Sequence, residues 1–263
     1  MFKFRLMILL VCVFFMRQSV LIADEGNTAE GLFKSPESRD EFAREISLVV
    51  GKAWEKWQDN VTVENIAVDG SQGVLSSGDI KGPVLTEAAI MAEFDRGMRS
   101  GDYSDCVRAV AQAVSNGMRL WQHGYSNDNI PFPQGANCVY TLTPCHNMPV
   151  AIMSGYSDGD RAMTEEELYN YMLYRAPRHE GNILLIFHGA ASAISRSFQR
   201  WQGSCVISGI LAKGGVAPQP SPMGTGPGRV RGAKGSGGRL TGAYFDSDLM
   251  YETMCEYMAD RRQ

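Results

Sequence analysis

Motifs of catalytic chemistry are scarce in this chain of 263 residues, which contains only four histidines. We predict no serine nucleophile on a strained turn. Residues 232–236 resemble the end of a phosphate-binding loop only superficially, because the glycine spacing is one residue short. Cys138, Cys145 and His146 lack the second closely spaced ligand pair that zinc sites use. The sequence therefore predicts no catalytic, metal-binding or cofactor-binding residues, and we favour a protein that is not an enzyme.

Long apolar runs are also missing, except at the N-terminus. Lys3 and Arg5 precede an apolar run over residues 6–16, a pattern typical of a secretory signal peptide. The run is shorter than the roughly 20 apolar residues that cross a bilayer. We predict a signal peptide at residues 1–23 and export to the periplasm, cell surface or extracellular space. A retained anchor is the alternative, and no second segment is apolar enough to span a membrane.

Cysteine is sparse, with six in the chain and five after residue 23. An oxidising compartment permits disulfides, although an odd number leaves one thiol free or bonded between chains. Cys138 and Cys145 flank a short loop that contains Pro144, which makes them the candidate pair. Closing such a loop would stabilise the fold by roughly 2–3 kcal/mol. Two unpaired, partly buried thiols are the alternative.

Three of the four tryptophans are followed by glutamine, and an alignment on them indicates an internal repeat. Apolar residues recur seven and three residues before each tryptophan and nine residues after it. The first two spacings and the tryptophan itself lie on one face of a helix, so each copy is predicted to be an amphipathic helix with the tryptophan in its last turn. The predicted core positions are Val50, Trp54, Trp57 and Ile66 in the first copy, Val114, Met118, Trp121 and Ile130 in the second, and Ile194, Phe198, Trp201 and Ile210 in the third.

Helix-start signals mark further elements. Ser38 with Glu41 and Thr164 with Glu167 fit capping boxes, in which a hydroxyl and a carboxylate satisfy backbone donors of the first turn. Leu85-Thr86 and Leu240-Thr241 resemble the same kind of start.

These patterns predict a mainly α fold of two to three tandem helix–helix–loop repeats, with long Gly/Pro-rich extended loops that allow minor β structure. The predicted parts are a signal peptide (1–23), a flexible lead (24–34), repeat 1 (35–85), repeat 2 (86–162), repeat 3 with a basic Gly/Pro-rich arm (163–240) and a C-terminal helix (241–263).

Acidic residues are missing between residues 181 and 245, a segment that contains seven lysines and arginines although the whole chain has a net charge of −4. Such segregation predicts contact with an anionic surface, which is this protein's own acidic portion, a second copy or another protein. The candidate contacts are Arg229, Arg231, Lys234 and Arg239. We do not expect nucleic acid as the partner, because the basic segment lacks aromatic platforms for bases.

The combined pattern favours an exported structural or assembly protein that associates with itself or with a larger particle. Acidic and basic regions would let copies meet head to tail, a contact that makes rings or filaments. The first alternative is an extracellular module that binds a glycan or peptide on surface tryptophans. The second is an enzyme of an unrecognised class, with a site between repeats.

Overall fold

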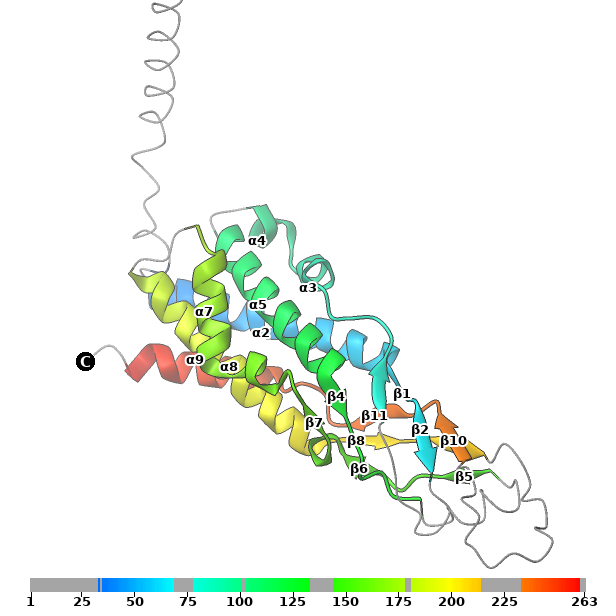
Figure 1. Ribbon diagram of the computed structural model, residues 1–263. Coiled ribbons are helices and arrows are strands. Elements are labelled where there is room, and N and C mark those ends of the chain that lie inside the picture. Colours follow the sequence, from blue (N-terminus) through cyan, green and yellow to red (C-terminus); the bar gives the residue numbers. More distant parts are fainter. Residues whose placement is uncertain are drawn as a thin grey trace, which may run out of the picture.

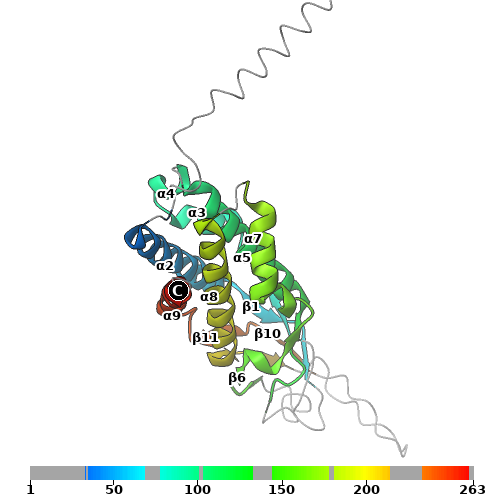
Figure 2. The same cartoon turned by 90° about the vertical axis from the view of Figure 1, so that its left-hand side faces the viewer.

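A computed structural model describes residue 33 and residues 35–68, 78–100, 103–132, 144–177, 181–213 and 233–260. Helices gather toward one end of the molecule and strands toward the other (Figures 1 and 2). The predicted signal peptide and most of the predicted lead lie outside the described residues, as do Cys138, Arg229 and Arg231.

The helices of the described part are α2 (Pro36–Asn60), α3 (Glu87–Glu93), α4 (Arg96–Ser100), α5 (Ser104–Gly124), α7 (Glu165–Arg175), α8 (Asn182–Ser204) and α9 (Ser247–Asp260), with 3-10 turns η2 (Ile152–Ser154) and η3 (Asp160–Met163). The strands are β1 (Thr62–Glu64), β2 (Ile66–Val68), β3 (Asp79–Lys81), β4 (Tyr125–Ser126), β5 (Cys145–His146), β6 (Val150–Ala151), β7 (Tyr156–Ser157), β8 (Cys205–Ser208), β9 (Leu211–Lys213), β10 (Ala233–Ser236) and β11 (Arg239–Gly242). They form four antiparallel sheets, ordered β1-β3, β2-β10-β9-β5, β11-β8-β6 and β4-β7.

The predicted mainly α fold of tandem helix–helix–loop repeats is wrong. The segments that follow the tryptophan helices are strands in antiparallel sheets, so the protein is a mixed α and β structure. In β1 the central residue Val63 is buried and its two neighbours are partly exposed. This alternation has the period of two that is typical of a strand, but a strand of three residues is too short for the sequence to show it. Leu240-Thr241 was expected to start a helix, but it lies in β11, and α9 begins at Ser247.

The three tryptophan helices nevertheless share a local arrangement in the structure. Each helix ends three residues after the tryptophan of its Trp-Gln pair. A strand follows each helix: β1 follows α2, β4 follows α5 and β8 follows α8. Each of these strands pairs antiparallel with a later strand, and that later strand precedes a second helix: β3 before α3, β7 before α7, and β11 before α9. The strand pair therefore connects a long helix to a shorter one in each case.

Helix starts follow the expected chemistry, with one shift. The hydroxyl of Thr164 accepts a hydrogen bond from Glu167 N, at the start of α7. The first capping box was placed on Ser38, but α2 begins earlier, because Pro36 opens the helix and Ser35 caps it. The Ser35 hydroxyl accepts from Ser38 N at 3.0 Å. Proline is well suited to the first turn, where its missing N–H is not needed.

The core lies where α2, α5 and α8 meet. All twelve predicted core residues are buried, and no tryptophan is more than 3% exposed. The Trp201 ring lies 5.3, 5.8 and 5.4 Å from the rings of Trp54, Trp57 and Trp121. Phe245, which precedes α9, stacks on Trp54 at 4.7 Å. Edge-to-face pairs at such distances stabilise beyond their area alone, each by roughly 0.5–1.5 kcal/mol.

Glutamines that follow the tryptophans satisfy buried indoles on neighbouring helices. Trp57 Nε1 donates to Gln122 Oε1 at 3.0 Å, and Trp201 Nε1 donates to Gln58 Oε1 at 2.8 Å. The amide of Gln122 then donates to Pro83 O, while that of Gln58 donates to the carbonyls of residues 240 and 243. Each buried amide thus ties two helix ends to the segment before a second helix.

The third glutamine is arranged differently. Gln202 is partly exposed, and its amide donates to Asp160 Oδ1 at 3.2 Å. Trp121 Nε1 is buried without a hydrogen-bond partner among the described residues. The three Trp-Gln pairs therefore occupy comparable places in the core but do not carry equal hydrogen bonds.

This asymmetry predicts unequal costs for two matched substitutions. Gln58→Met should lower the free energy of unfolding by about 2–4 kcal/mol, because it leaves a buried indole N–H and two carbonyls without a partner. Gln202→Met should cost less than about 1 kcal/mol, because the hydrogen bond from Gln202 to Asp160 is exposed. Urea unfolding followed by tryptophan fluorescence measures both. Equal losses for the two variants would contradict the assigned hydrogen bonds.

A polar cluster joins α2 to α9 at the surface. Tyr251 donates to Asp40 Oδ1 at 2.5 Å, and Arg44 donates to the Tyr251 oxygen at 3.0 Å. The hydrogen bond from Tyr251 holds the pKa of Asp40 below its usual value, helped by Arg44. The same hydrogen bond, with some desolvation, raises the pKa of Tyr251 to about 12.

The cluster predicts an acid-dependent link between the two helices. Because the pKa of Asp40 is lowered on folding, its contribution to stability is present above the unfolded pKa of about 3.9 and is lost as the pH falls through the folded pKa. Tyr251→Phe should therefore make the melting temperature less sensitive to pH in the acid range. Thermal unfolding from pH 7 down to pH 2 tests this, and identical acid profiles for the two proteins would refute it.

Candidate interaction surface

The four-stranded sheet β2-β10-β9-β5 has one face in the core and one face toward solvent. In the register of its strands, Gly235 lies opposite both Ile66 and Ala212, and Ala212 lies opposite Cys145. These four residues are buried. A side chain at position 235 would approach Ile210 Cγ2 to 2.9 Å, so glycine lets the strand lie close to the core. Alternate residues on each strand therefore point outward.

The outward residues form two rows across the sheet and are all exposed. One row consists of Ala67, Lys234 and Lys213, and the other of Ser236, Leu211 and His146. We call these six residues the basic face. It contains two lysines and no carboxylate, and Leu211 is 44% exposed at its centre.

The two lysines of the basic face are direct cross-strand partners. Lys234 on β10 is paired with Lys213 on β9, which brings their Cβ atoms to roughly 4.5–5.5 Å. Like charges directly opposite one another destabilise a sheet. Neither lysine forms an ion pair with a carboxylate within the described residues. Within the described residues, the two charges therefore have no carboxylate that offsets their repulsion.

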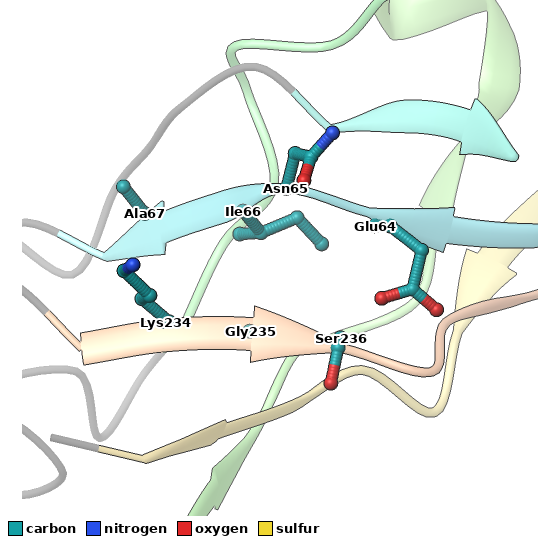
Figure 3. Close-up of a pocket in the computed structure, with 7 residues that line it drawn as sticks. All are labelled: Glu64, Asn65, Ile66, Ala67, Lys234, Gly235 and Ser236. Carbon is teal, nitrogen blue, oxygen red and sulfur yellow. The ribbon is translucent and has the colours of Figure 1, made fainter. Parts of the chain in front are cut away.

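A hollow of about 490 Å³ lies over β2 and β10 at the edge of the basic face. Figure 3 shows Lys234 and Glu64 toward opposite ends of the hollow, with Ile66 between them. Glu64 Oε1 accepts a hydrogen bond from Gly237 N at 3.2 Å, so this carboxylate is already used within the fold. The lining residues are Glu64, Asn65, Ile66, Ala67, Lys234, Gly235 and Ser236.

The predicted anion contacts are divided by the structure. Lys234 lies on the basic face, whereas Arg239 lies on β11 and donates to Asp59 O at 3.1 Å. Arg229 and Arg231 lie outside the described residues. Sequence reasoning missed Lys213, because only the strand register brings it beside Lys234. The sequence signal that could have pointed to Lys213 is its position in the segment without acidic residues, 181–245.

The helical end of the molecule has the opposite charge. Helix α9 contains four acidic residues and no lysine or arginine, and α2 contains six acidic and four basic residues. Figure 1 shows α9 leading away from the strands, so the acidic helix and the basic face point to different ends. The charge segregation seen in the sequence is only partly a separation in space, because Arg196 and Arg200 of the basic segment lie on α8 and pair with Glu256 and Asp246.

Cysteine and histidine chemistry offers little for catalysis in the described part. Burial raises the pKa of Cys106 and of Cys205 to about 12, so neither thiol is activated as a thiolate. His188 is stacked against the rings of Tyr169 at 3.5 Å and Tyr257 at 5.7 Å. Within the described ranges, no group of three or more His, Cys, Asp or Glu residues is arranged to hold a metal ion.

Cys145 is disulfide-bonded, whereas Cys106, Cys205 and Cys255 are free thiols. The predicted partner, Cys138, lies outside the described residues, so this pairing stays a prediction.

None of the helices that the structure describes combines the length and the apolar character needed to cross a membrane. Comparison with known proteins adds no ligand or partner, since no family model, no curated protein and no solved structure matches this chain.

Proposed function

We propose that the protein is an exported, non-enzymatic assembly component whose copies associate head to tail through the basic face. The observation that carries the proposal is the cross-strand pair of Lys213 and Lys234, two adjacent cations without a counter-charge in the described fold. A carboxylate-bearing surface placed on this pair would offset their repulsion. The acidic helices of another copy provide such a surface.

The separation of charge makes self-association one-directional. The basic face belongs to the sheet and the acidic helix α9 leads away from it, so a contact between them uses different surfaces on the two copies. Such a heterologous contact continues from copy to copy until it closes into a ring or extends as a filament. Opposite charges also speed the encounter, and this effect falls as salt screens them.

The fold bears differently on the two alternative functions, a binding module and an enzyme of an unrecognised class. A glycan- or peptide-binding module would need indoles at the surface, but every tryptophan is almost fully buried. The buried tryptophans count against the binding module, so we favour the assembly role over it, and an enzyme of an unrecognised class stays the alternative.

Export to an oxidising compartment predicts the disulfide Cys138–Cys145. Non-reducing peptide mapping of the native protein should recover one cross-linked peptide that contains these two cysteines, and reduction should separate it. A cross-link from Cys145 to any other cysteine, or a free Cys145 thiol, would refute the pairing.

Self-association should depend on salt in a characteristic direction. The purified protein should form oligomers at low ionic strength and dissociate as salt is added, because the Debye length falls from about 30 Å at 0.01 M to about 3 Å at 1 M. Association through apolar surface would persist or grow under the same change. Light scattering with sedimentation velocity across this range measures the outcome, and a monomer at every salt concentration would refute the proposal.

If copies associate through the basic face, the charges of Lys213 and Lys234 should contribute to association. Lys213→Gln with Lys234→Gln should weaken association at low salt by at least about tenfold, which corresponds to about 1.4 kcal/mol. Lys52→Gln with Arg96→Gln makes the same charge change on exposed residues of α2 and α4 and should leave association near the wild-type level. Equal weakening by both pairs would indicate a net-charge effect and would count against the basic face.

A further inference from the structure

Helix α9 carries its four acidic residues at a regular spacing of four. Asp248, Glu252, Glu256 and Asp260 recur at i, i+4, i+8 and i+12, which places them along one face of the helix. The first three are exposed. We call Asp248, Glu252 and Glu256 the acidic stripe.

The acidic stripe lies on the face of α9 that is turned away from the core. Met250, Met254 and Met258 are buried at the same spacing of four, and each is offset by two residues from the acidic positions. Two residues correspond to about 200° around a helix of 3.6 residues per turn, so the methionine and acidic faces are nearly opposite. The methionines anchor α9, and the carboxylates are left to solvent or to a partner.

Little within the described fold neutralises the acidic stripe. Arg196 approaches Glu256 to 3.6 Å, yet the Glu256 side chain remains 73% exposed. Like charges at i and i+4 destabilise a helix by roughly 0.2–0.5 kcal/mol per pair. A surface of opposite charge would offset this cost, as it would for the two lysines of the basic face.

We infer that the occupant of the basic face is the acidic stripe of a second copy, with Glu252 and Glu256 facing Lys213 and Lys234. This inference rests on the proposed head-to-tail association and names its counter-surface. The spacings agree, because cross-strand partners have Cβ atoms about 4.5–5.5 Å apart and i, i+4 helix residues about 5–6 Å apart. Two ammonium groups can therefore meet two carboxylates side by side.

Other acidic surfaces fit less well. On α2, Asp40 is already engaged by Tyr251 and Arg44, and the helix also carries four basic residues that would face the lysines unfavourably. The stripe of α9 is free of lysine and arginine over its whole length. Charge complementarity thus favours α9 over α2.

A charge-swap experiment tests this pairing. Variant A carries Lys213→Glu and Lys234→Glu, so that its sheet and α9 are both acidic. Variant B carries Glu252→Lys and Glu256→Lys, so that both surfaces are basic. At low salt, each variant alone should associate at least about tenfold more weakly than wild type, and an equimolar mixture should recover association as alternating A and B copies.

The matched control for variant B is Glu41→Lys with Glu45→Lys, which makes the same change at the same spacing on α2 and should associate like wild type. Circular dichroism and the melting temperature establish that each variant is folded. If variant A fails to associate while variant B associates like wild type, the basic face stands and the role of α9 is overturned. If both variants associate like wild type, or wild type is a monomer, the proposed function fails as well.

Discussion

The hydrogen bonds between buried tryptophans and glutamines are the constraint on which the rest of the structure depends. Burying an indole N–H without an acceptor costs free energy, and two of the four buried indoles, those of Trp57 and Trp201, donate to a glutamine. Gln58 and Gln122 supply that acceptor from neighbouring helices, and their amides also bind carbonyls before the second helices. The ends of the long helices are thereby fixed relative to one another, and the strands begin directly from those ends.

The position of the basic face follows from this core. Gln58 binds the carbonyl of Leu240 in β11, and the residue before β11, Gly238, pairs with Val63 of β1. These contacts hold the segment that contains β10 against the first tryptophan helix and its strand. Strand β10 then pairs with β9, which follows the third tryptophan helix, and Lys234 comes to lie beside Lys213. Apolar packing in the core thus creates the like-charge pair at the surface.

Sequence reasoning could predict the elements whose signals are long. The tryptophan helices run for 21 to 25 residues, enough for the helical period to show, and the Thr164 cap lies next to its helix. The strands were missed because they are two to four residues long, too short for a period of two. Lys234 was predicted from charge alone. Lys213 and the acidic stripe needed the register of a sheet and the buried face of α9, both of which depend on contacts between residues far apart in the chain.

The direction of α9 determines what kind of assembly the charges can build. A two-fold dimer would require each copy to present the same self-complementary patch, but the basic face and the acidic stripe lie on different elements that point to different ends. The proposed contact is therefore heterologous, and an open chain of copies ends in one free basic face and one free acidic stripe. Growth stops only when the rotation between copies closes a ring. Because both surfaces are exposed and charged, ionic strength would control the length of the proposed assembly without disturbing the buried tryptophan core.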